Sequence, residues 1–251
     1  MDTVVSVTDP DRFAVAGALE GVPSAMAAAR DAIDALLRDR GLRRSSPAVT
    51  GESLLRGAVA SARLAGSAST LPEARAGTGD ALTSACVRTA TELLGLVPTW
   101  SRAPLQALAR LHAVVGAGLV SADSLGRPGD PNGVARLREL TAALSTPTSA
   151  PGLVVAALVH AEVATAGAFG GVLDPVLGRA AERLVLVATG VDPASVTVPE
   201  AGHAELADGY RAALQAYAHG GTPGVQRWLL HAAQAYAGGA RAGGEVLTYP
   251  P

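Results

Sequence analysis

The chain has 251 residues, of which 49% are hydrophobic but only 3% aromatic, so it can bury the core of one large domain of closely packed helices. Its net charge of −2 provides no basic field that would attract nucleic acid or an acidic membrane. All 20 basic residues are arginine, which excludes a lysine Schiff base, a phosphate-loop lysine and an SxxK nucleophile.

Cysteine content and the N-terminal segment bear on where the protein works. The single cysteine, Cys86, permits no internal disulfide and no cysteine-rich zinc site, and its apolar helical surroundings predict a packed thiol. The N-terminal segment carries acids rather than the basic stretch of a signal peptide, and the longest apolar runs are too short to span a bilayer. We therefore expect a cytoplasmic protein with neither a nucleic-acid nor a membrane partner.

The first half of the chain predicts an extended arm followed by separate helices. Residues 1–22 are expected to be extended, and with a helix at about 24–40 they form an N-terminal region, residues 1–49. Thr50 caps a helix that reaches about Ala65, and a polar, turn-forming stretch follows. Further helices are predicted at about 80–95, 102–116 and 130–144. The turn-rich segment 118–133 leaves room for a loop or a short β-ribbon.

The second half is organised around residues 153–191, which predict two apolar helices joined by a glycine-rich turn. Residues 191–203 are expected to be irregular, two last helices lie near 205–218 and 224–238, and residues 241–251 are expected to form a flexible tail. No alternating run is long enough for a sheet. The predicted fold is therefore all-α with at most a short β-ribbon, and its main domain covers residues 50–240.

Motif-like residues occur in both halves. Ser61 and Gly66 fit the pattern S/TxxxE(G/N), and Thr70 and Glu73 follow, although Ala65 occupies the glutamate position. In the two central helices and their turn, Phe169 matches the phenylalanine of an HPFxxGNGRxxR loop. His160 matches a histidine on the helix before that loop. Later matches are Gly190, Asp192, Pro193, Tyr210, Leu214 and Trp228. In order and spacing these residues resemble the Fic/Doc, or fido, family, which implies a fido-like helical domain with a central helix-loop-helix over about residues 50–238.

The residues that the family's chemistry requires are missing. The resemblance implies that a loop histidine is the general base for AMP transfer, and that the GNG backbone and two arginines hold nucleotide phosphates. Gly167 occupies the histidine position, and the other motif positions are held by Val172, Leu173, Asp174, Pro175 and Gly178. A shifted alignment places Gly178 and Arg179 on the family's Gly-Arg, but it needs a four-residue insertion and supplies no histidine. The family's inhibitory glutamate and its arginine partner are lost together.

Asp174 carries the strongest argument against a nucleotide. Asp174 and Pro175 are expected to open the second central helix as N-cap and first residue. A helix N-terminus attracts phosphate because its amides point outward and its dipole is positive there. A carboxylate in that position would repel a polyphosphate at short range.

Three hypotheses for function follow. The first is a degenerate fido domain, a pseudoenzyme that acts as a binding or regulatory protein for an unidentified protein or small molecule, without AMP transfer and with no cofactor. The second is an enzyme of altered group-transfer chemistry in the same cleft, and the third is a helical interaction protein unrelated to the family. Alanine-rich helix faces also permit a homodimer. The candidate cleft consists of Ser61, Arg63, Gly66, His160, Glu162, Phe169, Gly170, Gly171, Asp174 and Arg179.

The histidines predict no metal site. His160 lies on an apolar helix and is expected to be a satisfied core residue. His203, in a loop with Glu205, is expected at the surface. The other histidines show no ligand spacing, and they are His112, His219 and His231.

Overall fold

The computed structural model describes residues 11–39 and 42–248, and in these residues it is built of helices without a strand. One isolated bridge joins Ala117 to Val120 where a short ribbon was allowed. The helices are α1 (Arg12–Gly17), α2 (Val22–Leu37), α3 (Leu42–Leu64), α4 (Leu71–Ala76), α5 (Ala81–Leu93), α6 (Val97–Arg102), α7 (Pro104–Gly116), α8 (Pro131–Leu144), α9 (Gly152–Thr165), α10 (Asp174–Ala188), α11 (Pro199–Glu205), α12 (Ala207–His219) and α13 (Gly221–Thr248). The all-α prediction is confirmed.

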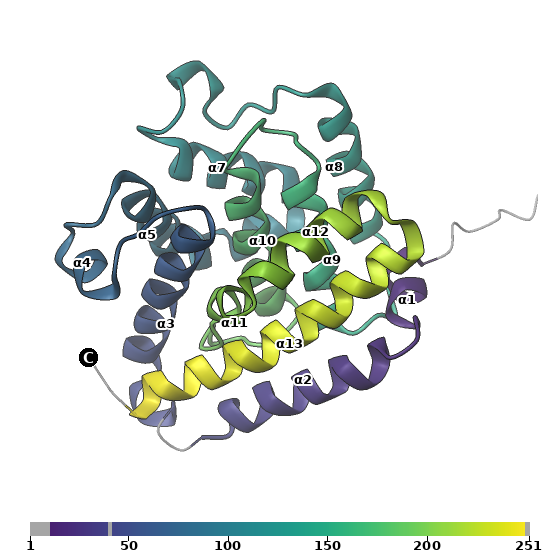
Figure 1. Cartoon of the computed structure of the whole chain (residues 1–251), viewed down its shortest axis with the longest axis horizontal. Helices are drawn as coiled ribbons and strands as arrows, with labels where there is room; N and C mark the ends of the chain where they lie inside the picture. Colours follow the sequence, from purple (N-terminus) through teal and green to yellow (C-terminus); the bar gives the residue numbers. More distant parts are fainter. Residues whose placement is uncertain (1–10, 40–41, 249–251) are drawn as a thin grey trace, which may run out of the picture.

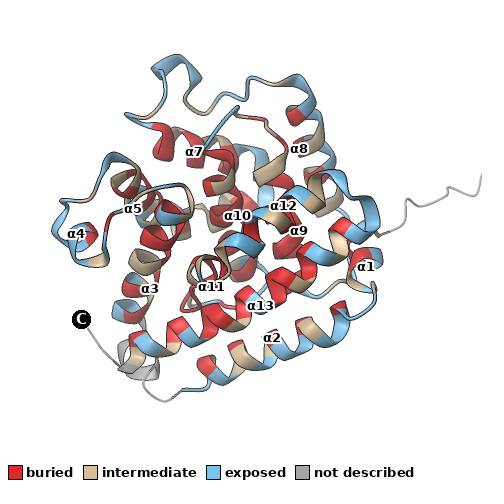
Figure 2. Ribbon diagram, viewed as in Figure 1, coloured by how far each residue is buried: buried red, intermediate tan, exposed pale blue. Residues whose placement is uncertain are grey.

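The centre of the molecule is the antiparallel pair α9 and α10, which make the most extensive contact between two helices (Figure 1). Every residue of α9 from Leu153 to Val163 is buried, as expected of a helix that is apolar on all sides (Figure 2). The pair can approach closely because α10 carries Gly178, where a Cβ atom would lie 2.7 Å from the carbonyl oxygen of His160. The predicted central helix-loop-helix is therefore the core of the fold.

The longest helix, α13, closes the molecule by lying along α2 and packing on α9, α11 and α12 (Figure 1). The predicted flexible tail needs correction here, because α13 continues through Thr248 and Val246 is fully buried. The glycines that favoured a tail permit close packing instead. A Cβ atom at Gly239 would lie 2.8 Å from the Val198 carbonyl oxygen, and one at Gly243 would lie 2.5 Å from the Val196 carbonyl oxygen. Residues 249–251 lie outside the described residues.

Three more segments differ from the sequence expectation. Part of the predicted extended arm is the helix α1, capped by the Asp11 carboxylate, and residues 1–10 lie outside the described residues. The polar stretch after α3 contains α4, which begins with a capping box between Thr70 and Glu73. The end of the segment predicted to be irregular forms α11. Helix α3 begins at Leu42 and runs through Thr50, so the prediction that Thr50 caps this helix was wrong.

Two simpler expectations can be checked directly. The thiol of Cys86 is buried at 3% exposure, so the prediction of a packed thiol is confirmed. Among the described residues, none of the helices combines the length and hydropathy needed to cross a bilayer.

Candidate functional site

The loop between α9 and α10 lies where the sequence places the family's catalytic motif. Gly167, Gly170 and Gly171 have φ of 71°, 70° and 152°, a region that L side chains rarely adopt, so this sequence of turns depends on glycine. Val172 is 64% exposed, whereas Leu173 is buried and precedes α10 as its N-cap residue. Asp174 is thus the first residue of the helix, which corrects the predicted N-cap position by one residue.

The Asp174 side chain is turned into the protein at the N-terminus of α10. It is 3% exposed, and neither carboxylate oxygen has an aligned hydrogen-bond donor. Burial raises the pKa of Asp174 to about 6, and the nearby amides of Phe169, Gly170 and Gly171 offset this effect only in part. The carboxyl group of Asp174 therefore occupies the N-terminal end of α10.

We expect Asp174→Asn to stabilise the protein above pH 6, by about 1–2 kcal/mol. The pKa of Asp174 in the folded protein is about 6, above its ordinary value of 3.8. The protonated side chain therefore contributes its full stability below pH 3.8. This contribution is lost as the pH rises through about 6. Urea unfolding from pH 4 to pH 8 measures the effect, which should vanish at the acid end.

The matched control is Asp192→Asn, because the buried Asp192 carboxylate accepts hydrogen bonds from the backbone amides of Val196 and Thr197. This variant should lose stability at neutral pH. An Asp174→Asn variant that is less stable than the wild type at pH 8 would contradict the assignment.

Arg179, the nearest candidate for a phosphate-binding arginine, points inward instead of toward the loop. It is 1% exposed, and its guanidinium donates to Ser61 Oγ at 2.8 Å, to Ser61 O at 3.0 Å and to the Tyr210 hydroxyl at 2.8 Å. Each of the three guanidinium nitrogens therefore donates a hydrogen bond that joins α10 to α3 or α12.

Arg183, one turn further along α10, is also consumed by internal contacts. It forms a two-pronged ion pair with Glu200 at 2.6 and 3.1 Å and donates to Ser53 and Ser195. Gly57 on α3 leaves space for this pair, since a Cβ there would lie 2.7 Å from the Arg183 guanidinium. Neither arginine is free to hold a substrate phosphate.

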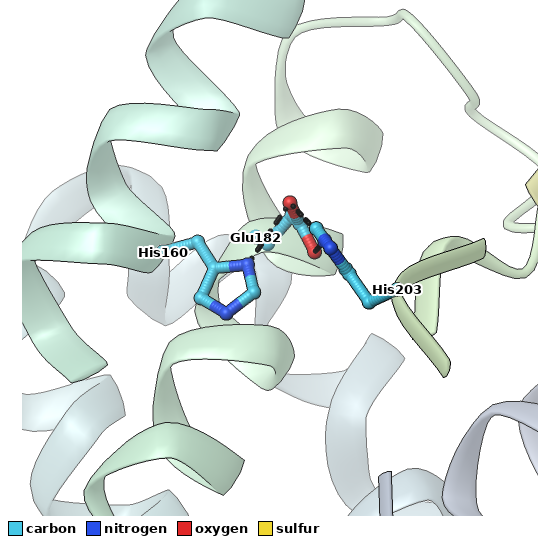
Figure 3. Close-up of side chains that lie close together, drawn as sticks. All are labelled: His160, Glu182 and His203. Atoms are coloured by element: carbon cyan, nitrogen blue, oxygen red, sulfur yellow. Dashed lines mark hydrogen bonds and ion pairs between the residues drawn. The ribbon is translucent and has the colours of Figure 1, made fainter. Parts of the chain in front are cut away.

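The interior of the domain holds a polar cluster that the sequence did not predict, formed by His160, Glu182 and His203 (Figure 3). These side chains come from α9, α10 and α11 and are completely buried. Glu182 Oε1 lies 3.1 Å from His160 Nδ1, and both carboxylate oxygens lie 3.3 Å from His203 Nε2. His203 is therefore a core residue, and the prediction of a surface loop was wrong.

Aromatic and histidine side chains surround this cluster. Tyr236 donates to Glu182 Oε1 at 2.9 Å, the Tyr210 hydroxyl lies 3.0 Å from His160 Nε2, and His231 Nε2 lies 3.1 Å from His203 Nδ1. Burial lowers the pKa of His160 to about 4 and that of His231 to about 3. Burial alone would raise the pKa of Glu182, but the nearby His160 and His203 side chains hold it well below its usual range by electrostatic attraction. The centre is therefore one buried carboxylate between two buried imidazoles.

The predicted cleft residues do not form one site. Ser61 and Arg179 meet, and Tyr210 links them to His160. Glu162 instead binds Arg136 at 2.8 Å and the Tyr217 hydroxyl at 2.7 Å. The remaining predicted residues lie apart from these contacts, with Phe169 stacked on His112, Asp174 buried at the loop, and Arg63, Gly66, Gly170 and Gly171 exposed.

Sequence reasoning missed Glu182, His203, His231 and Tyr236. One signal was available, because the apolar helix predicted around residue 180 carries Arg179, Glu182 and Arg183 at spacings of three and four, which places them on one face. Charged residues inside a buried helix require partners, so this face indicated an internal polar network.

Room for a substrate beside these residues is small. A hollow of about 30 Å³ lies against Ser61, Cys86, Arg183 and Glu200, which is space for a water molecule. Hollows of about 610 and 540 Å³ lie elsewhere, one between α1, α2 and the start of α9, the other between α3, α11 and α12.

Comparison with known structures fits this arrangement. A crystal structure described as a Fic family protein from Desulfovibrio desulfuricans G20 superposes with a TM-score of 0.69 at 16% sequence identity, covering 88% of this chain and 74% of that chain. The fold is therefore Fic-like. No protein-family model and no curated protein matches the sequence.

Proposed function

We propose that this chain is a catalytically degenerate Fic-like protein, a cytoplasmic binding or regulatory protein that transfers no AMP. The observation that carries the proposal is the buried Asp174 carboxylate at the N-terminus of α10, where an anion would otherwise meet free helix amides. Two further contacts support it, since Arg179 and Arg183 are both committed to internal partners. Gly167, at the position of the family's loop histidine, has no group that accepts a proton.

The alternative of altered group-transfer chemistry in the same cleft has less support. It requires Ser61, Arg63, His160, Glu162, Asp174 and Arg179 to converge, and only the pair Ser61 and Arg179 is in direct contact. The hollow beside Ser61 holds about 30 Å³, which is too small for a substrate.

Titration with Mg-ATP tests the proposal. We expect no binding tighter than about 1 mM, and no label transferred from ATP to this chain or to proteins of a lysate, because base and phosphate site are both missing. A competent Fic enzyme measured in parallel shows that the assay detects transfer. Micromolar Mg-ATP binding accompanied by transfer of AMP or phosphate would contradict the proposal.

Asp174→Asn sharpens this test. If the carboxylate repels anions at the helix end, the variant should bind tripolyphosphate more tightly than the wild type near pH 7.5, by roughly threefold to tenfold, and the difference should shrink in high salt. Asp208→Asn, which removes an exposed acid from α12, is the matched control and should leave the affinity unchanged. Equal affinity for all three proteins would show that Asp174 does not close the site.

A further inference from the structure

The buried cluster of His160, Glu182 and His203 has the donor set and spacing of a metal centre. One potential ligand atom from each of the three side chains lies within 4.8 Å of the other two, and the two contacts to Glu182 are 3.1 and 3.3 Å. Atoms that share one metal ion at bonds of about 2.0–2.2 Å are separated by roughly 3–4 Å. Imidazole nitrogens and a carboxylate oxygen are also the ligands that Zn²⁺ takes most readily apart from thiolates.

The orientation of two of these atoms favours a shared ion over a simple hydrogen bond. His160 Nδ1 lies 3.1 Å from Glu182 Oε1, yet it has no aligned hydrogen-bond partner, and Glu182 Oε2 has none either. Both atoms are completely buried, so leaving them unpaired costs free energy. A cation between the three side chains would use the lone pairs that direct hydrogen bonding leaves unused (Figure 3).

Each of the three side chains also has an outer partner. The far ring nitrogen of His160 lies 3.0 Å from the Tyr210 hydroxyl, and that of His203 lies 3.1 Å from His231 Nε2. Tyr236 donates to the carboxylate at 2.9 Å. Such partners fix which ring nitrogen is free to bind a metal, and they are a regular feature of protein zinc sites.

We propose that His160 Nδ1, Glu182 and His203 Nε2 bind one Zn²⁺ ion that holds α9, α10 and α11 together. With zinc bound, His160 Nε2–H donates to the Tyr210 oxygen and His203 Nδ1–H donates to His231 Nε2. All three ligands are 0% exposed and none lines a described hollow, so the ion enters as the chain folds and serves stability rather than catalysis.

Metal analysis of the untagged protein tests the proposal, because an affinity tag would itself bind zinc. The protein purified without chelator should contain about one zinc per chain. After unfolding and refolding with EDTA, its Tm should fall by on the order of 10 °C, and refolding with ZnCl₂ should restore it. Refolding with CoCl₂ should give the visible absorption of cobalt bound by nitrogen and oxygen ligands.

Variants separate ligands from bystanders. Glu182→Gln and His203→Gln should lose the metal, and His231→Gln should lower the zinc affinity roughly 10- to 100-fold by removing an outer partner. His219→Gln, at an exposed histidine of α12, should keep it. If the ligand variants fail to fold, the wild-type refolding experiment still decides. Less than a tenth of an equivalent of any metal, with the same Tm in EDTA and in ZnCl₂, would overturn the proposal and leave a metal-free hydrogen-bond network.

Discussion

Gly202→Ala is expected to lower the free energy of unfolding by about 3 kcal/mol or more, one of the largest effects available from a single methyl group in this chain. Gly202 lies on α11 where this short helix crosses α13, and a Cβ there would lie 1.9 Å from the Ala235 carbonyl oxygen. That oxygen belongs to helix backbone and cannot turn aside. The helices would have to separate, which would shift His203, the next residue, out of the buried cluster.

Urea unfolding followed by circular dichroism measures this effect, and Gly51→Ala is its matched control. Gly51 is an exposed helical glycine with no atom within 4 Å of an added Cβ, so alanine there should stabilise the protein by about 0.5–1 kcal/mol. A Gly202→Ala protein with wild-type stability would show that α11 and α13 are farther apart than described.

Glu200→Gln is expected to cost about 3–5 kcal/mol, because it leaves the Arg183 guanidinium charged and without its counterion in the core. Arg183 is 2% and Glu200 6% exposed, and their ion pair connects α10 to α11 while Ser53 and Ser195 bind the remaining guanidinium nitrogen. The variant should unfold at a lower urea concentration with an unchanged slope.

Two comparisons define the origin of that loss. Glu205→Gln removes an acid from the same helix, but its partner is the exposed Arg241, so its cost should stay within about 0.5 kcal/mol. The double replacement of Arg183 by Met and Glu200 by Leu should be less damaging than Glu200→Gln alone, since no charge then remains buried. If the double variant lost as much stability as the two single replacements together, the two residues would act independently.

The sequence predicted the helices well where apolar spacing continued over several turns. The central pair was found because residues 153–159 form an uninterrupted apolar run, and α10 begins within one residue of the position indicated by Asp174 and Pro175. The link between Ser61 and Arg179 also joins two segments that the resemblance had singled out.

What sequence reasoning missed depends on contacts between distant segments. Gly238, Gly239 and Gly243 suggested a flexible tail, but they allow helix α13 to approach the backbone of α11 and of residues 196–198, which precede it. His203 gave no sign of burial, because its surroundings are Trp228 and His231 on α13 and Glu182 on α10. The contact of His203 with Glu182 has no local spacing, so no single window of sequence could show that these two residues meet.

The position of α13 has a consequence for biosynthesis. This helix covers faces of α2, α9, α11 and α12, so a nascent polypeptide on the ribosome exposes those faces until the 28 residues of α13 have emerged. The contact between α2 and α13, which are far apart in the sequence, therefore forms only after α13 has been translated.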